Sequence, residues 1–232
     1  MAEKHWFLKR CQLFERLSAA ELAQLESQSR CRRFDAGAVV YLPADQADAV
    51  LALTQGRVKI CHPTPDGKET ILAFIEPGEI FGEMCLFSTT DREELAIAVE
   101  ASTIVLIPRD VLQSLVDRHA ELALSVTRLV GFRRQRIERR LKHLLFHAHR
   151  ERLIHLLLEL AETYGVKQNS DIEIRIKLSH QDLAGLIGST RESVSTTLGE
   201  LQAAGLVRLG RGKLTITGRK ALAEELRRVK HE

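Results

Sequence analysis

The apolar pattern of this chain changes its period at Pro108. Between about Phe34 and Ile107, short apolar runs alternate with turns rich in glycine and proline; the runs are AGAVVYLP, AVLALTQGRVKI, ETILAFIEPGEIFGEM and LAIAVEASTIVLIP. Many short strands separated by turns are typical of a β-sandwich or barrel. The preceding LSAAELAQLESQS has apolar residues at helical spacing and Ser18 as a possible N-cap, so we predict a covering helix there.

After Pro108 the apolar residues recur at helical spacing over roughly 30 residues. Such a helix is too long for an ordinary globular domain, and the simplest partner for its apolar stripe is a second copy of itself in a homodimer. Arg133 and Arg134 interrupt the stripe, so we expect one of the two at the seam. The stripe consists of Leu115, Leu122, Val126, Leu129, Val130, Ile137, Leu141, Leu144 and Leu145.

Length and composition restrict the class of protein. A chain of 232 residues is long enough for two domains. No stretch approaches the roughly 18 apolar residues of a membrane span, and the first residues lack the apolar core of a signal peptide. We therefore expect a cytoplasmic protein with no membrane partner. Its cysteines are far apart and predict reduced structural thiols; they are Cys11, Cys31, Cys61 and Cys85.

The basic excess lies in the second part of the chain. Residues 1–145 carry 20 basic and 20 acidic side chains, whereas residues 146–232 carry 14 and 11. This bias suits a phosphate-binding surface without establishing one.

The second part reads as a helix, RERLIHLLLELAETYG, that ends at Gly165 as C-cap, then a polar linker, VKQNSD, and an alternating strand, IEIRIKL. Two helices follow in SHQDLAGLIGSTRESVSTTLGELQAAGLV, where Ser179 caps the first, Ser189 caps the second and Gly188 forms the turn. This is the spacing of a helix-turn-helix. The apolar side chains of both helices are expected to be buried, and small Ala184 lets the helices cross closely.

Polar side chains on this helix pair form the predicted DNA-binding surface. At the start of a major-groove helix, arginine can bind guanine and glutamate can accept from cytosine, while hydroxyls bind phosphates. The next segment, LVRLGRGKLTITG, predicts a hairpin with a basic tip, which makes a wing. The predicted DNA-binding residues are Ser179, His180, Ser189, Thr190, Arg191, Glu192, Ser193, Ser195, Thr196, Arg208, Arg211 and Lys213.

With these motifs, the sequence resembles the cyclic-AMP receptor and fumarate-nitrate regulator (Crp/Fnr) superfamily over almost its whole length. The resemblance rests on the FGE motif at residues 81–83, the spaced glycines Gly37, Gly56 and Gly78, and the recognition-helix segment STRESVSTTLGEL. It implies an α+β protein in which residues 1–110 form a cyclic-nucleotide-binding-like β-roll (jelly roll), 111–145 the dimerisation helix and 146–232 a winged helix-turn-helix.

The resemblance also implies that Arg191 and Glu192 read the bases of a palindromic, TGTGA-like site in double-stranded DNA. Where similar regulators have a second arginine, this chain has Thr196, which leaves the exact half-site open. An activator would also contact RNA polymerase.

In members of the superfamily that bind cyclic nucleotides, a glutamate and an arginine hold the ligand, and Glu83 and Arg92 match these two residues. The residues after Arg92 are Glu93 and Glu94, whose charge repels an anion. The long helix has Ile137 and Glu138 where such proteins have an adenine-binding Thr-Ser pair. Both departures point away from ordinary cyclic-AMP binding.

The chain is also similar to the cyanobacterial nitrogen regulators that respond to 2-oxoglutarate, in KLSHQDLAGLIGSTR and DREELAIAVEASTIVLIP. This resemblance places a small anionic effector at Arg92 and Arg133, with Arg134 as the neighbouring candidate. The alternative is that Glu93, Glu94 or Glu138 neutralises these arginines, in which case the regulator has no effector and is controlled by its abundance.

Metal and enzyme functions have weaker sequence support. His143 and His147 are four residues apart, with His149 and His155 nearby, and could bind a metal ion or haem, although solvent-facing histidines at a hinge are more common. The prediction is therefore no metal and no certain cofactor. A cupin-type enzyme would need an HxH motif within the sheet, where His62 is the single histidine.

Overall fold

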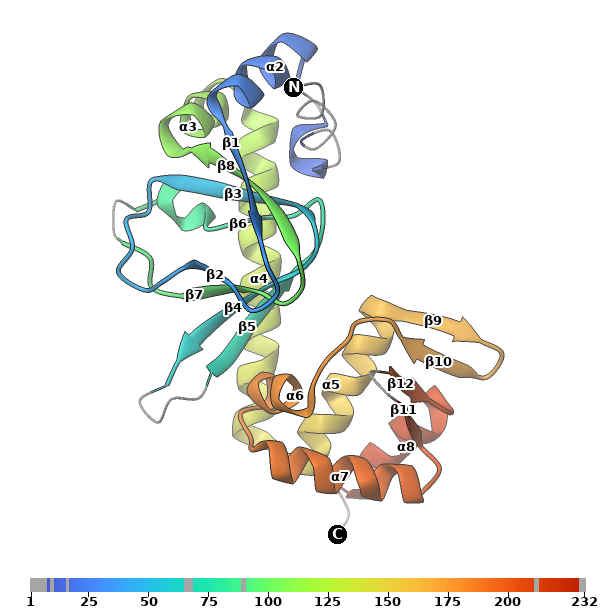
Figure 1. The fold of residues 1–232 in the computed structure, drawn as a ribbon. Coiled ribbons are helices and arrows are strands. Elements are labelled where there is room, and N and C mark those ends of the chain that lie inside the picture. The colour runs from blue at the N-terminus through green and yellow to red at the C-terminus, as the bar shows by residue number, and fades with distance from the viewer. Residues whose placement is uncertain are drawn as a thin grey trace. The chain divides into compact units, whose positions relative to one another are not determined.

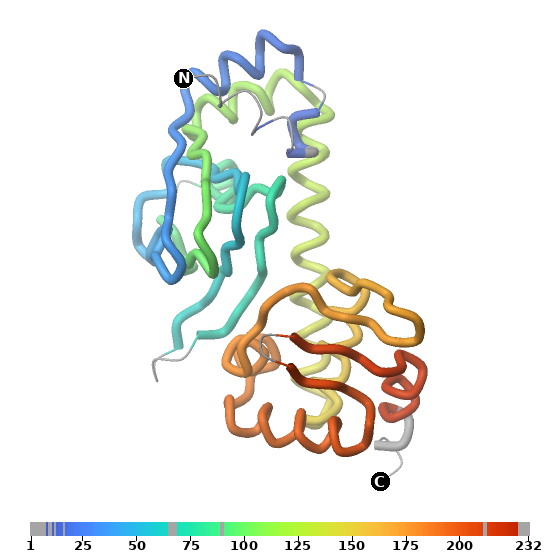
Figure 2. The backbone as a smooth tube through the Cα atoms, turned by 45° about the vertical axis from the view of Figure 1, so that its right-hand side comes forward, coloured from blue at the N-terminus to red at the C-terminus, as the bar shows by residue number. Residues whose placement is uncertain are grey.

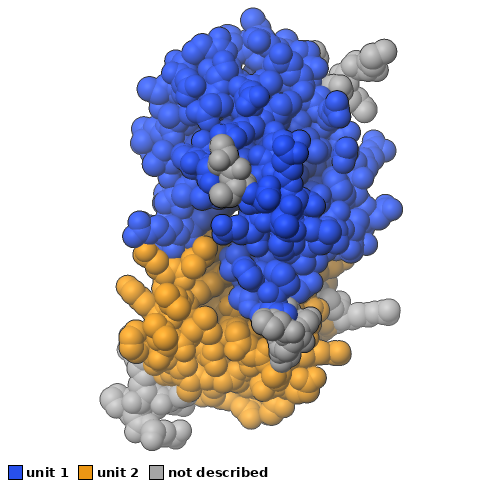
Figure 3. Space-filling model, turned by 90° about the vertical axis from the view of Figure 1, so that its left-hand side faces the viewer, with its two compact units in different colours: residues 1–135 blue, residues 136–232 orange. Residues whose placement is uncertain are grey.

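The computed structural model describes residues 8, 11–15, 17–64, 69–88, 91–210 and 213–229. The chain divides into two compact units, residues 1–135 and 136–232, which are taken in turn below (Figures 1 and 3). Within the described part, no helix combines the length and apolar character of a membrane span.

Unit 1 contains two four-stranded antiparallel sheets, as the alternating runs predict. Their strand orders are β1-β8-β3-β6 and β2-β7-β4-β5. The predicted β-roll is confirmed, and its turn glycines Gly37, Gly56 and Gly78 all have positive φ, a conformation that favours glycine. The strands are β1 (Arg30–Phe34), β2 (Val39–Tyr41), β3 (Ala49–Gln55), β4 (Val58–Pro63), β5 (Glu69–Ile75), β6 (Ile80–Phe81), β7 (Leu95–Ala98) and β8 (Ser102–Pro108).

Strand β3 is buried on both faces and joins the two parts of the core. Leu51 and Leu53 belong to the cluster that includes residues from both sheets, whereas Val50 and Ala52 point to the opposite face, into a cluster with helical residues. The helical side consists of η1 (Gln12–Phe14), α2 (Ala19–Gln28) and α3 (Arg109–Arg118). Helix α2 begins at Ser18, whose side chain accepts from the Glu21 backbone N–H, so the predicted cap is confirmed.

The stretch predicted as one helix over 111–145 is two helices. Helix α3 ends at His119, which has extended backbone (φ −120°, ψ 96°), and α4 (Ala120–Phe146) follows. The His119 Nε2 lies 2.6 Å from the Glu21 Oε1 on α2. The break allows Leu115 and Leu122 to enter the same core cluster. The first part of the predicted dimer stripe is therefore part of the core of unit 1.

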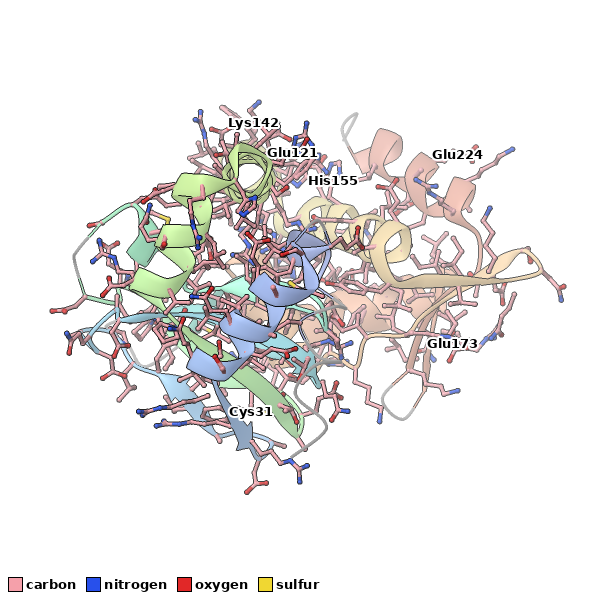
Figure 4. The ribbon with its side chains drawn as sticks, turned by 90° about the horizontal axis from the view of Figure 1, so that it is seen from above. Cys31, Glu121, Lys142, His155, Glu173 and Glu224 are labelled. Carbon is pink, nitrogen blue, oxygen red and sulfur yellow. The ribbon has the colours of Figure 1, made fainter. Side chains whose placement is uncertain are left out.

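The cysteines are free thiols, in agreement with the sequence prediction. Cys11, Cys61 and Cys85 are buried, whereas Cys31 on β1 is exposed (Figure 4). Burial raises the pKa of Cys11 to about 12 and also raises the pKa of Cys85. The Cys11 and Cys85 thiols therefore remain protonated at neutral pH.

Unit 2 packs helices against a four-stranded antiparallel sheet of order β11-β12-β10-β9. The predicted polar linker VKQNSD is instead most of a hairpin formed by β9 (Gly165–Gln168) and β10 (Asp171–Ile174) (Figure 2). Asn169, in the turn of this hairpin, has a φ of 57°. Gly165 is the C-cap of α5 as predicted, with extended backbone; a side chain there would meet the Ala161 carbonyl oxygen. The elements are α5 (His149–Tyr164), β9 (Gly165–Gln168), β10 (Asp171–Ile174), α6 (His180–Ile187), α7 (Arg191–Ala203), β11 (Val207–Gly210), β12 (Lys213–Ile216) and α8 (Arg219–Val229).

Candidate nucleic-acid interface and sensor site

Helices α6 and α7 form the predicted helix-turn-helix (Figure 1). The Ser179 side chain accepts from the Asp182 backbone N–H at 3.0 Å, and the Asp182 carboxylate accepts from the Ser179 N–H at 2.9 Å. This reciprocal capping box starts α6 as predicted. Gly188 ends the helix in the left-handed conformation (φ 60°), which turns the chain toward α7.

The cap of α7 is Thr190 and not Ser189, which corrects the sequence prediction. The Thr190 side chain accepts from the Ser193 backbone N–H at 3.2 Å. The Ser189 hydroxyl instead lies 2.9 Å from the His149 Nδ1 on α5. The turn after Gly188 is therefore one residue longer than the Ser-Glu spacing suggests.

The two helices cross on an apolar contact. Ala184 of α6 is fully buried and presents only a methyl group, and α7 buries Val194, Leu198 and Leu201 completely. Because these residues recur every three or four positions, the opposite face of α7 is left to solvent. The core therefore fixes which side chains of α7 can meet a ligand.

The exposed side chains at the start of α7 are Arg191, Glu192, Ser193 and Thr196. They occupy the first two turns of the helix, the part that reaches base edges when a helix enters a major groove. The other predicted residues are less free, because Ser195 Oγ lies 2.7 Å from the His180 Nδ1 and donates to the Arg191 carbonyl.

The basic wing is present, and two of its cations are exposed but paired. The Arg208 guanidinium lies 3.0 Å from Asp171, and the Lys213 ammonium 3.1 Å from Glu173. Lys213 lowers the pKa of Glu173 by hydrogen bonding to it, with a contribution from Gln168. Exposed pairs of this kind contribute little to stability, so either cation can turn to a phosphate at small cost. Arg211 lies outside the described residues.

Sequence reasoning missed Arg150 and Arg152, the residues that connect α5 to the reading helices. Arg152 Nη1 donates to the Ile187 carbonyl in the last turn of α6 at 2.9 Å, and Arg150 Nη1 donates to Glu200 of α7 at 2.7 Å. Their only signal in the sequence is the i, i+2 spacing of two arginines near the start of a helix, which is too common to interpret.

In unit 1, Glu83 and Arg133 form an ion pair. The Arg133 Nη1 lies 2.7 Å from the Glu83 Oε2, and Arg133 also donates to the Ile80 carbonyl. Glu83 begins the short helix η2 (Glu83–Leu86) and is buried, whereas Arg133 comes from α4. Arg133 is therefore neutralised by Glu83, a carboxylate that the sequence did not suggest for this role.

Arg92 is buried in the same region and is held by backbone groups. Its guanidinium donates to the carbonyls of Gly82, at 2.7 Å, and Ala49, and lies 4.7 Å from the centre of the Tyr41 ring. Glu94 accepts from the Tyr41 hydroxyl at 3.1 Å. Burial and this carboxylate raise the pKa of Tyr41, so the hydroxyl stays protonated.

The other residues considered in the sequence analysis lie in different parts of the structure. Arg134 is exposed on α4, whereas the adjacent Arg133 is partly buried and bonds to Glu83. In the predicted histidine cluster, His143 and His147 are joined by His155, while His149 bonds to Ser189. His62 is exposed on β4 and lies apart from any histidine cluster found among the described residues.

Comparison with known proteins matches both units. Residues 31–119 match the family model of the cyclic nucleotide-binding domain, and residues 151–225 that of the Crp-like helix-turn-helix domain. The fold predicted from the sequence is confirmed.

Individual relatives align over most of their length. The chain is 30% identical over 219 residues to the cyclic AMP receptor protein of Thermus thermophilus, covering 94% of this chain and 98% of the relative. It is 29% identical over 210 residues to the global nitrogen regulator of Synechococcus elongatus, covering 88% and 93%. A CooA variant from Carboxydothermus hydrogenoformans has a similar fold, with a TM-score of 0.79 at 22% identity over 95% of each chain.

Proposed function

Because this chain belongs to the Crp/Fnr superfamily of DNA-binding transcription regulators, we propose that it acts as a cytoplasmic homodimer that reads a palindromic DNA site and responds to a small anionic effector. The relatives matched are regulators and not enzymes, as the sequence predicts. The observation that carries the proposal is the exposed polar start of α7 on a helix pair whose other face is fully buried.

The reading residues follow from exposure and chemistry. Arg191 can donate two hydrogen bonds to guanine, and Glu192 can accept from cytosine, which suits a TGTGA-like half-site. Thr190 and Ser193 lie beside them at the helix start, where hydroxyls and backbone N–H groups meet phosphates. Arg208 and Lys213 on the wing supply contacts that depend little on sequence. Thr196 has a shorter side chain than the arginine that similar regulators have at this position, so it reaches less far toward the DNA.

Dimerisation rests on the second half of α4. Ile137, Leu141 and Leu144 are 45%, 52% and 41% exposed, and with Val130 they recur at heptad positions. Apolar side chains in this pattern pack into the same stripe of a parallel twin. Two recognition helices related by the dimer axis then reach half-sites about 34 Å apart.

The effector site is proposed at Glu83, Arg92 and Arg133. Glu83 already neutralises Arg133. A carboxylate or phosphate of the effector would therefore bind Arg133 by taking the place of Glu83. Cyclic AMP, named for the Thermus relative, and 2-oxoglutarate both carry such a group. Displacement of Glu83 acts directly on α4, the proposed dimer helix.

One observation favours a second candidate, a regulator controlled by its abundance. Both arginines are already satisfied within the protein, Arg133 by Glu83 and Arg92 by backbone carbonyls. In that case the Glu83–Arg133 pair is a permanent structural link.

The test is selection from a randomised duplex library by the purified protein at fixed salt, alone, with cyclic AMP and with 2-oxoglutarate. The proposal predicts an enriched palindrome whose recovery depends on one of these anions. An enriched palindrome that is independent of both supports the abundance-controlled regulator. Failure to enrich any palindrome under all three conditions would contradict the DNA-reading assignment.

A further inference from the structure

Three histidines meet where α4 ends and α5 begins. One nitrogen from each of His143, His147 and His155 lies within 4.8 Å of the other two. The His143 and His155 rings stack with centroids 4.2 Å apart, and the His147 ring is 4.9 Å from His155. His155 lies on α5 (Figure 4), His143 is in the last turn of α4, and His147 is in the intervening turn.

We propose that these three histidines form a site for a divalent late transition metal, with Zn²⁺ as the probe ion. Imidazole is a preferred ligand of zinc, and three protein ligands with a fourth position open to water is an established zinc geometry. Zinc–nitrogen bonds of about 2.0–2.1 Å place tetrahedral ligand atoms about 3.4 Å apart. The three nitrogens therefore need only small side-chain rotations to close around an ion.

Glu151 supports the site in the way that carboxylates support metal-bound histidines. Its Oε2 lies 3.1 Å from the His147 Nδ1 and also accepts from the Ala148 backbone N–H at 3.0 Å. Glu151 is buried, so the carboxylate is held in one position. A proton on Nδ1 would then be donated to Glu151, leaving Nε2 of His147 as the metal ligand.

Charged side chains of both signs lie beside His143. A hollow of about 20 Å³ next to it is lined by Glu159 and by the cations Arg140 and Arg152. Glu159 lies 3.9 Å from Arg140 and 3.7 Å from Arg136, so this one carboxylate partly offsets the two arginine charges nearest the site.

Metal binding would link the end of α4 to the first half of α5. This half of α5 also carries Arg152, which holds the last turn of α6. Occupancy therefore stabilises the connection into the helix-turn-helix, and the stabilisation is measurable without DNA.

The experiment uses the full-length protein without an affinity tag, because a histidine tag would bind the same ions. Zn²⁺ uptake is measured by competition with a chromophoric chelator. The proposal predicts one ion per chain, no competition from Mg²⁺, which prefers oxygen ligands, and a rise in melting temperature on binding.

Variants separate the site from nonspecific binding. His143→Gln and His147→Gln should each weaken Zn²⁺ binding at least 10-fold and remove the rise in melting temperature, while the exposed His62→Gln retains both. Glu151→Gln keeps an acceptor for the Ala148 N–H but loses the carboxylate, and should weaken binding about 10- to 100-fold. Absence of Zn²⁺ uptake by the unmodified protein, or equal uptake by the His143 and His147 variants, would overturn the proposal.

Discussion

Glu83 and Arg133 connect η2 to α4 through an ion pair with a 2.7 Å separation between Oε2 and Nη1. By the sequence resemblance, Glu83 corresponds to the glutamate that holds the ligand in cyclic-nucleotide-binding members of the superfamily. Arg133 corresponds to an arginine that holds the effector in the nitrogen regulators. A single contact thus couples the β-roll to the helix on which dimerisation is proposed. An anion that competes for Arg133 would release this contact, so the pair is suited to transmit binding.

Replacing Glu83 by glutamine should destabilise unit 1. The substitution leaves the partly buried Arg133 charge without its counterion, at a cost of about 1–3 kcal/mol in the free energy of unfolding. Urea unfolding at constant protein concentration measures the effect, with the exposed Glu93→Gln as control. A loss no larger than that of the control would show that the ion pair contributes nothing.

Gly82 is required for a close contact with Arg92. Its φ is 65°, and a Cβ atom there would lie 2.4 Å from the Arg92 Nη1. Gly82→Ala should therefore cost about 1–3 kcal/mol. Gly199→Ala, in the interior of α7 where the added methyl group meets open space beyond its own helix, should instead stabilise by about 0.5–1 kcal/mol. Thermal unfolding of the two variants should show opposite shifts, and shifts of the same sign would contradict this assignment.

The acid sensitivity of unit 1 should depend on Glu21. Hydrogen bonds from Ser18, followed by His119, lower the pKa of this carboxyl from 4.5 to about 2. A carboxyl with a lowered pKa in the folded state contributes stability above pH 4.5 that is lost as the pH falls toward 2. Glu21→Gln should therefore flatten the stability profile between these two values. An unchanged slope in this window, measured by urea unfolding at successive pH values, would exclude the contribution.

The cap of α7 can be separated from its DNA contacts at Thr190. Thr190→Ala removes the acceptor for the Ser193 N–H and should cost about 1 kcal/mol of stability. Thr190→Asp restores a cap and hence the melting temperature, but its negative charge should weaken DNA binding by repelling phosphate. Recovery of both stability and DNA affinity in the aspartate variant would place Thr190 away from the DNA backbone.

The sequence predicts elements whose signals are local. Alternating apolar runs are sufficient to predict the two sheets, and Ser179 with Asp182 is sufficient to locate the start of α6. The break at His119 has no glycine or proline to mark it, because it arises from packing of Leu115 and Leu122 into the core. Likewise, Ser189 and Thr190 are both good caps, and only the position of His149 on α5 decides between them.

Ion-pair partners were predicted less well than elements. The sequence offered Glu93, Glu94 or Glu138 as the carboxylate that neutralises the arginines, whereas Arg133 pairs with Glu83, 50 residues away. Pairings over such distances depend on how the sheets and α4 pack. For the same reason, the contribution of His155 to the histidine cluster becomes clear only when α5 is placed beside the end of α4.

The most direct test of DNA reading by α7 compares Arg191→Ala with Lys213→Ala on the selected site and on a scrambled duplex, over a series of salt concentrations. Arg191→Ala should lose about 1–3 kcal/mol of discrimination between the two duplexes, because the guanidinium reads a base. Lys213→Ala should weaken both complexes equally and reduce the salt dependence by about one phosphate contact. If Arg191→Ala retained full selectivity, the assignment of the start of α7 as the base-reading surface would be wrong.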